Sequence, residues 1–234
     1  MRKTFHTFYS GVQKAMVDGS SDERMRLILE WVGSGKRVLD IACNDGRESE
    51  RLIRAGNEVY GIEISEDVAR LAEQKGVKMS VLDVEEEDLP FPDGFFDAII
   101  ACEIIEHLVD TDRFLRQVRS KLKDHGTLVL STPNLASLGR RFLLLRGKNP
   151  FVEFSLEEKV SSHLEPVGHL RYFVRETLCH LLRKHRFQVQ TLTSDQLNLG
   201  LFTSFRLARW FPALAWRFIV RATKLPDAPL ERKP

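Results

Sequence analysis

The feature that most constrains the fold is an alternation between short runs rich in valine and isoleucine and charged stretches with apolar residues at helical spacing. Strands that alternate with amphipathic helices form βαβ units, so this pattern predicts a parallel sheet with helices packed against it. We expect strands at 37–41, 58–62, 77–82, 96–101, 127–131 and 188–193, and a seventh at 217–222.

Helical patterns fill the segments between the expected strands. The clearest one places Phe114, Leu115, Val118 and Leu122 on one face, a period of 3.6 residues. Two late segments match no regular element, and an α/β enzyme would place substrate loops there. We therefore expect a single domain over 1–234, with a helical N-terminal cover at 1–34 and substrate-side insertions at about 134–168 and 197–212. The expected helices lie at 22–31, 48–55, 66–75, 111–123 and 175–184.

Composition excludes several classes of protein. The 234 residues allow one large domain or two small ones. No apolar run reaches the roughly 18 residues that a membrane span needs. The three cysteines are too few for a disulfide scaffold and lack metal-finger spacing. The expected location is the cytoplasm, with its reducing conditions.

The net charge of +2 hides an asymmetry, because residues 1–134 carry −7 and residues 135–234 carry +9. The stretch 196–226 contains no acidic residue. Basic residues interleaved with aromatic ones suit an anionic membrane surface or a stacked nucleic acid, so we expect peripheral membrane contact, with RNA the less favoured partner. Within this stretch we favour a surface helix at 204–211 and a core strand at 217–222. Its basic residues are Arg206, Arg209, Arg217, Arg221 and Lys224.

The first expected strand runs into a helix through the sequence VLDIACNDG. Asp40 closes the strand and Gly46 opens the helix, at the position where an α/β sheet binds a nucleotide-like ligand. A glycine there lets the backbone approach a ligand closely. Seventeen residues later, Glu63 ends the second strand and could accept hydrogen bonds from ribose hydroxyls. The alternative is an ordinary turn, with Asp45 as helix cap and Glu63 solvated.

The third strand ends near Asp83, in VLDVEEEDLPFPDGFFDAII. A carboxylate at this strand tip could take an adenine amino group, and the backbone N–H of Val84 could meet a ring nitrogen. Taken alone, an acid at this position is more often an ordinary loop residue.

Together these segments resemble the class I S-adenosylmethionine-dependent methyltransferases. The similarity covers VLDIACNDG, VYGIEIS, the acidic segment with the fourth strand, GTLVLSTPN and HLRYFVRETLCHLLRKHRF, in that order. It implies an α/β Rossmann-like fold: a mostly parallel seven-stranded sheet with helices on both faces and an antiparallel last strand. It also implies S-adenosyl-L-methionine as cofactor. The cofactor-binding positions that it implies are Asp40, Ala42, Asn44, Gly46, Glu63, Ile64, Asp83, Val84 and Cys102.

The chain departs from that family in its first motif, where Ala42 and Asn44 replace two glycines. Asparagine adopts positive φ more easily than most residues, so we expect the turn to be kept. By the same resemblance, Asp40 helps hold the methionine end of the cofactor, and Tyr9 and Arg24 would cover its methionyl group.

A second candidate site follows the fourth strand, in ACEIIEHLVD. Glu103, Glu106 and His107 are spaced i, i+3, i+4 and would share one face of a helix. With a histidine from the later loop, His163 or His169, they could hold Mg²⁺ or Mn²⁺. The expected metal set is Glu103, Glu106, His107 and His169. The pattern resembles metal-assisted O-methyltransferases, including small-RNA 2′-O-methyltransferases and ubiquinone-pathway enzymes.

Two other interpretations of this cluster stay open. His107 could act as the general base that removes the acceptor's proton, which makes it the catalytic candidate. The cluster could also be purely structural.

The favoured function is methyl transfer from S-adenosylmethionine to a hydroxyl of a small-molecule, glycan or lipid-linked acceptor. One alternative is a metal-assisted RNA ribose 2′-O-methyltransferase. Another is a catalytically idle cofactor-binding partner protein, suggested by the missing glycines.

Overall fold

The computed structural model describes residues 20–150, 168–199 and 202–226, and the structural statements below concern those residues. Their centre is a seven-stranded sheet with strand order β3-β2-β1-β4-β5-β9-β6. The strands are β1 (Arg37–Ile41), β2 (Glu58–Glu63), β3 (Lys78–Val81), β4 (Phe96–Cys102), β5 (Leu122–Pro133), β6 (Phe187–Thr193) and β9 (Arg217–Lys224).

The first five strands of the sheet are parallel, and β9 runs antiparallel between β5 and β6. The prediction of a mostly parallel sheet with an antiparallel last strand is confirmed. Residues 217–222 are confirmed as a core strand, because β9 is flanked by a strand on each side and its side chains Phe218, Ile219 and Val220 are buried.

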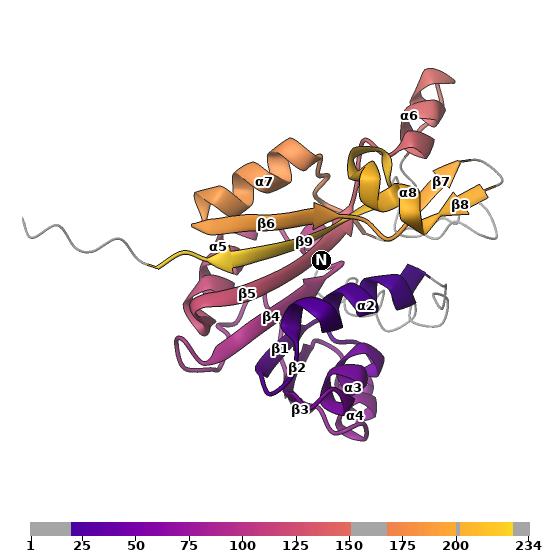
Figure 1. Ribbon diagram of the computed structural model, residues 1–234. Coiled ribbons are helices and arrows are strands. Elements are labelled where there is room, and N and C mark those ends of the chain that lie inside the picture. Colours follow the sequence, from indigo (N-terminus) through magenta and orange to yellow (C-terminus); the bar gives the residue numbers. More distant parts are fainter. Residues whose placement is uncertain (1–19, 151–167, 200–201, 227–234) are drawn as a thin grey trace, which may run out of the picture.

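Helices cover both faces of the sheet, as predicted (Figure 1). On one face, α5 (Thr111–Lys121) and α7 (Arg175–Lys184) pack on side chains such as Leu39 and Ile99. The other face, with Val38 and Ile100, takes α2, α3 and α4. The sheet alternates its apolar side chains between these two layers because successive strand residues point to opposite faces. The helices on this second face are α2 (Ser20–Val32), α3 (Arg47–Arg54) and α4 (Glu66–Glu73).

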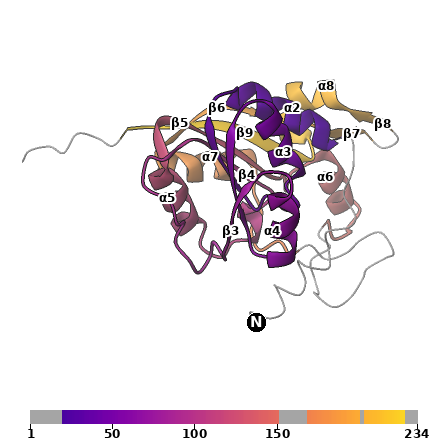
Figure 2. The same ribbon diagram turned by 90° about the horizontal axis from the view of Figure 1, so that it is seen from below.

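The expected irregular segments contain regular structure, which corrects the sequence-based view. The first includes α6 (Leu138–Leu145), while its residues 151–167 lie outside the described part. The second forms a hairpin, β7 (Leu197–Leu199) with β8 (Phe202–Ser204), followed by α8 (Phe205–Trp210). The predicted surface helix at 204–211 corresponds to α8. In Figures 1 and 2, α6, the hairpin and α8 gather at one end of the molecule, away from α5.

Within the described residues, no helix is long and apolar enough to cross a membrane.

Candidate functional site

The sheet's strand order locates the candidate site. From β1 the chain steps outward through β2 to β3, and then returns to place β4 on the other side of β1. Ligands of open α/β sheets bind at such a switch point, outside the carboxyl ends of the strands. The predicted site residues that follow β1, β2 and β4 therefore share one edge of the sheet.

The loop after β1 keeps a tight turn without the usual glycines. Ala42, Asn44 and Gly46 have φ values of 59°, 53° and 74°, so the prediction that Asn44 adopts positive φ is confirmed. Gly46, not Asp45, caps α3. A side chain at Gly46 would place its Cβ 2.8 Å from the Cβ of Ala72, so packing against α4 also requires a glycine there.

Asp40 is a buried carboxylate near the end of β1. It accepts a hydrogen bond of 2.6 Å from the hydroxyl of Ser49 in α3. Burial raises its pKa to about 7, because a charged carboxylate loses hydration there. Asp40 can therefore gain or lose a proton near neutral pH.

Glu63 ends β2, and its carboxylate holds the neighbouring backbone. It accepts hydrogen bonds from the backbone N–H groups of Asn44, Ile64 and Ser65, at 3.0–3.2 Å. Burial raises its pKa despite these three bonds. Each carboxylate oxygen has about two acceptor sites, so the group retains capacity for a ligand hydroxyl.

The remaining predicted cofactor residues lie on the same edge. Asp83 accepts a hydrogen bond of 2.9 Å from the backbone N–H of Glu85 and so shapes the turn after β3. Val84, in that turn, is buried. Cys102 ends β4, and burial raises the pKa of its thiol to about 12, which keeps it neutral.

Arg24 reaches the site from α2. Its guanidinium donates to the carboxylate of Glu48 in α3. Its charge helps to lower the pKa of Glu103 and offsets part of the rise that burial causes in the pKa of Asp40. These contacts place Arg24 beside the edge, and its role in covering the methionyl group stays a prediction, whereas Tyr9 and His163 lie outside the described residues.

Glu106, His107 and His169 form a compact cluster just after β4. One ligand atom from each lies within 4.8 Å of the others. The buried Glu106 accepts a 2.9 Å hydrogen bond from Thr132 through Oε2, while its Oε1 has no hydrogen-bond partner among the described residues. His107 lies 3.3 Å from the carbonyl of Gly168 through Nδ1. Burial raises the pKa of Glu106 well above its usual range.

Glu103 does not join this cluster, which differs from the expected set of four. It has a φ of 52°, and only Ile105–His107 form a short 3-10 helix, so the three residues do not share a helical face. Its carboxylate instead accepts a 2.6 Å hydrogen bond from Ser131 and lies 3.6 Å from Nη1 of Arg217. Arg217 and Arg24 lower the pKa of Glu103 against the effect of burial.

The sequence did not indicate Arg217 and Asp195 as part of this edge. Arg217 begins β9 opposite Pro133, the last residue of β5. Because β9 is antiparallel, its first residue lies where the parallel strands end. Asp195 follows β6, is fully buried, and lies 3.4 Å from Nε of Arg217. The expected antiparallel direction of the last strand was the signal that could have placed Arg217 at this edge.

Comparison with known proteins agrees with this geometry. A family model described as a methyltransferase domain matches residues 16–192. A ubiquinone biosynthesis O-methyltransferase from Xanthomonas axonopodis pv. citri is 31% identical over 160 residues, which cover 60% of this chain and 67% of that protein. One from Bradyrhizobium diazoefficiens is 33% identical over 146 residues, 56% of each chain. The matches thus span between about half and two thirds of these relatives.

A solved structure shows the same fold. The 1,6-didemethyltoxoflavin-N1-methyltransferase from Burkholderia thailandensis, with its substrate and S-adenosylhomocysteine bound, has a TM-score of 0.64 at 15% sequence identity. The match covers 96% of this chain and 89% of that one. The fold, the residues at the carboxyl ends of the strands and the match to the family model together define an enzyme that transfers methyl groups. The chain belongs to the class I S-adenosylmethionine-dependent methyltransferases.

Proposed function

We propose that this enzyme transfers a methyl group from S-adenosylmethionine to a hydroxyl group of a small-molecule, glycan or lipid-linked acceptor. The observation that carries this proposal is the cluster of Glu106, His107 and His169 at the carboxyl end of β4. A hydroxyl acceptor must lose its proton as it is methylated, and an imidazole suits that task near neutral pH. The two ubiquinone-pathway relatives, named as O-methyltransferases, support a hydroxyl acceptor.

The residues along the edge fit the cofactor. Glu63 offers free acceptor sites for ribose hydroxyls, the loop at 42–46 brings backbone close, and Asp83 and Val84 stand where an adenine would lie. Asp40, near the end of β1, is a polar acid and Arg24, from α2, is a cation, and both suit the polar groups of the methionine part. S-adenosylmethionine supplies a methyl group already activated on a sulfonium, so the protein's main task is to position the acceptor.

A divalent metal ion fits the same cluster. Oε1 of Glu106 is buried without a hydrogen-bond partner among the described residues, and two imidazoles lie beside it. Carboxylate and imidazole ligands suit Mn²⁺, and a carboxylate suits Mg²⁺. In this second candidate role of the cluster, Glu106, His107 and His169 would hold the ion, which would polarise the acceptor oxygen. His107 would then be a ligand and would not also take the acceptor's proton.

Active catalysis is favoured over an idle cofactor-binding role. The idle alternative rested on the missing glycines, yet Ala42 and Asn44 adopt the positive φ that glycines would supply. An alanine in this conformation costs about 1–2 kcal/mol, and such strain is typically kept where a site needs it.

The acceptor's lipid character is supported by the surface at the same end of the molecule. Leu145 and Trp210, the last residues of α6 and α8, are 85% and 80% exposed. Exposed cations accompany them, and we propose peripheral contact with anionic membrane here. Three of the cations expected to contribute do not, because Arg217 faces Glu103, Lys224 is buried against the carbonyl of Leu122, and Arg221 is half-buried on β9 at the opposite edge of the sheet. The exposed cations are Arg141, Arg146, Lys148, Arg206 and Arg209.

The proposed reaction is tested by labelled methyl transfer to a panel of phenols, polyprenylated phenols and glycans. His107→Ala should lower kcat about 10²- to 10⁴-fold, the usual contribution of a general base, while S-adenosylmethionine affinity stays unchanged. His180→Ala, on the exposed face of α7, is the matched control and should retain full kcat. Failure to methylate any hydroxyl acceptor, or an unchanged kcat in His107→Ala, would overturn the proposal.

A further inference from the structure

A cavity of about 260 Å³ lies at the opposite edge of the sheet, where the parallel strands begin. Trp31 and Val32 at the end of α2 form one wall, and the start of β5 around Gly126 and Thr127 forms another. A water molecule's share of liquid volume is about 30 Å³, so the cavity has room for a group several times larger. It is separate from the methyl-transfer edge, which lies at the other ends of the same strands.

Arg221, one of the residues lining the cavity, forms no ion pair within the part of the chain that the structure describes. It sits on β9 between Val129 of β5 and Thr191 of β6, and its side chain is half-buried. Its Nε is buried and has no hydrogen-bond partner among the described residues. A donor of a charged group that is buried without a partner is costly, so the cavity that Arg221 lines is a suitable place for an anion.

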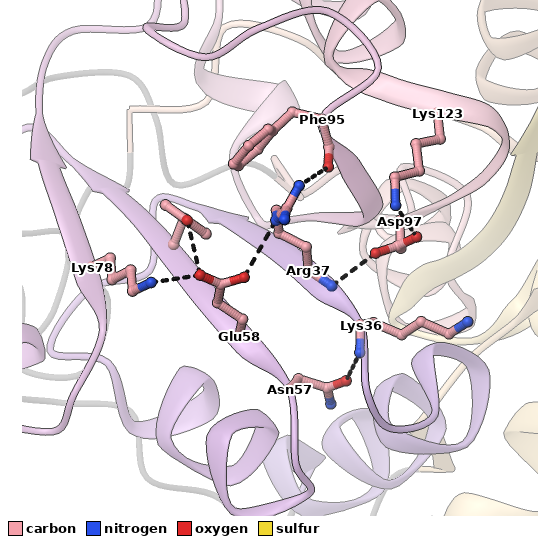
Figure 3. Close-up of polar contacts among 9 residues, drawn as sticks. Lys36, Arg37, Asn57, Glu58, Lys78, Phe95, Asp97 and Lys123 are labelled. Atoms are coloured by element: carbon pink, nitrogen blue, oxygen red, sulfur yellow. Dashed lines mark hydrogen bonds and ion pairs between the residues drawn. The ribbon is translucent and has the colours of Figure 1, made fainter.

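The acidic groups lining the cavity are already paired. Asp97 accepts hydrogen bonds from Nζ of Lys123, at 2.6 Å, and from the backbone N–H of Arg37, at 2.9 Å. Figure 3 shows Asp97 between these two donors, and the side chain of Lys36 extending away from it. Asp124 lies 3.2 Å from Nζ of Lys224.

The cavity therefore carries positive charge that its own acidic groups do not neutralise. Lys36 lies near enough to lower the pKa of Asp97, but its ammonium makes no hydrogen bond or ion pair with any side chain in the described ranges. With Arg221 it provides two cationic donors facing one polar cavity. Guanidinium and ammonium groups are the usual protein partners of phosphate oxygens.

We propose that this cavity is a second ligand site, which binds a phosphate-sized oxyanion, free or carried by a small organic molecule. Arg221 and Lys36 hold the oxygens, and Lys123 remains committed to Asp97. The indole of Trp31 offers an apolar wall for the organic part, when one is present. The site is independent of the methyl-transfer proposal, because it shares no residue with that edge.

The test is calorimetric titration of inorganic phosphate into the full chain in chloride buffer of constant ionic strength. The unmodified protein should bind one phosphate saturably, and Arg221→Gln should bind it at least about tenfold more weakly, the range for a lost charged hydrogen bond. Lys36→Gln should also weaken phosphate binding. Because Lys36 is exposed, this variant tests the site even if Arg221→Gln, which lies in a strand, fails to fold.

Lys78→Gln is the matched control, because it removes an exposed lysine at the same edge that already pairs with Glu58. It should bind phosphate like the unmodified protein. A parallel titration with phenyl phosphate separates the two ligand sources: tighter binding assigns the remaining volume to an organic group, and equal binding assigns the site to the free ion. Absence of saturable binding of either probe, or equal affinity in Arg221→Gln, Lys36→Gln and the unmodified protein, would overturn the proposal.

Discussion

At the scale of single residues, burial and neighbouring charges set the pKa of each acidic side chain in the site. Glu103 and Glu106 are three positions apart, yet Arg217 and Arg24 lower the pKa of one while burial raises that of the other. Asp40 and Glu63 are both buried acids whose pKa is raised by lost hydration. Residue type alone therefore does not assign a charge at this edge.

Glu63 should be required for cofactor affinity. Glu63→Gln keeps one oxygen for the backbone N–H groups of the loop, but removes the charge that a ribose hydroxyl would meet. We expect S-adenosylmethionine binding to weaken by about 1.5–3 kcal/mol, the range for a charged hydrogen bond, measured by calorimetry. Glu58→Gln, on the exposed start of the same strand, should bind normally. Unchanged affinity in Glu63→Gln would remove this residue from the cofactor site.

Asp40 should make stability depend on pH. Its pKa is about 7 in the folded protein against 3.8 for an ordinary aspartate. Below about pH 4 the group is protonated in both states and costs nothing. As pH rises from about 4 to 7 only the unfolded state loses its proton, so the free energy of unfolding falls, by up to about 4 kcal/mol.

Asp40→Asn should abolish that dependence, because an amide does not ionise. Denaturant unfolding at several pH values should show that the free energy of unfolding of the variant rises relative to that of the unmodified protein between pH 4 and 8. Asp67→Asn, at an exposed position on α4, should show no such change. Parallel pH curves for Asp40→Asn and the unmodified protein would contradict the assignment.

At the scale of elements, the segment after β4 departs from what its spacing indicates. A pattern of i, i+3, i+4 places side chains together only in a continuous helix. Here the left-handed φ of Glu103 breaks the helix, and a three-residue turn carries Glu106 and His107. The backbone N–H groups of Leu170 and Arg171 then donate to the carbonyl of Glu106, at 2.8 and 2.9 Å, which brings His169 to the cluster.

If the cluster binds a metal, activity should depend on Glu106 and His169 more than on Glu103. Activity should fall in excess EDTA and return with Mn²⁺ or Mg²⁺. Glu106→Gln and His169→Ala should weaken Mn²⁺ binding roughly 100-fold or more, above the 10- to 100-fold typical of residues that only support a ligand, measured by electron paramagnetic resonance. Glu103→Gln should have a smaller effect, because Ser131 and Arg217 hold its carboxylate. Full activity in a sample shown to be metal-free would exclude a catalytic metal.

At the scale of the whole molecule, α6, the β7–β8 hairpin and α8 extend the end where the parallel strands finish (Figure 1). Their exposed apolar side chains and cations lie at the end of the sheet that carries the candidate site. Under the proposed membrane contact, an acceptor with a lipid tail would reach the site from a bilayer at this end.

Membrane association should depend on these cations. Each lysine or arginine near an anionic surface contributes about 1 kcal/mol. The double variant Arg141→Glu with Arg146→Glu should therefore lower vesicle affinity by at least about 2 kcal/mol, or roughly 30-fold. The assay is sedimentation with vesicles of neutral or anionic lipid, and binding should weaken as salt shortens the Debye length.

The matched control is Arg175→Glu with Arg183→Glu, two exposed positions on α7. This variant should sediment like the unmodified protein. Equal recovery of the unmodified protein in the supernatant with neutral and anionic vesicles would contradict the proposed membrane contact.

The sequence by itself determined the elements whose character is local. The alternation of apolar runs and amphipathic helices predicted the seven strands, the helices between them and the edge that carries Asp40 and Glu63, because periodicity depends only on neighbouring residues. The resemblance to the family added the placement of helices on both faces. It also predicted the turn at Asn44, since that conformation is an intrinsic preference of asparagine.

Only the tertiary structure decided what depends on distant segments. The insertion of β9 between β5 and β6 placed Arg217 beside Glu103, and so separated that acid from Glu106 and the histidines. The same insertion placed Arg221 beside the cavity at the opposite edge, with its Nε buried and without a hydrogen-bond partner among the residues that the structure describes. Strand pairing joins residues about 90 positions apart in β5 and β9. A pattern of neighbouring residues does not show which strand the last one will pair with.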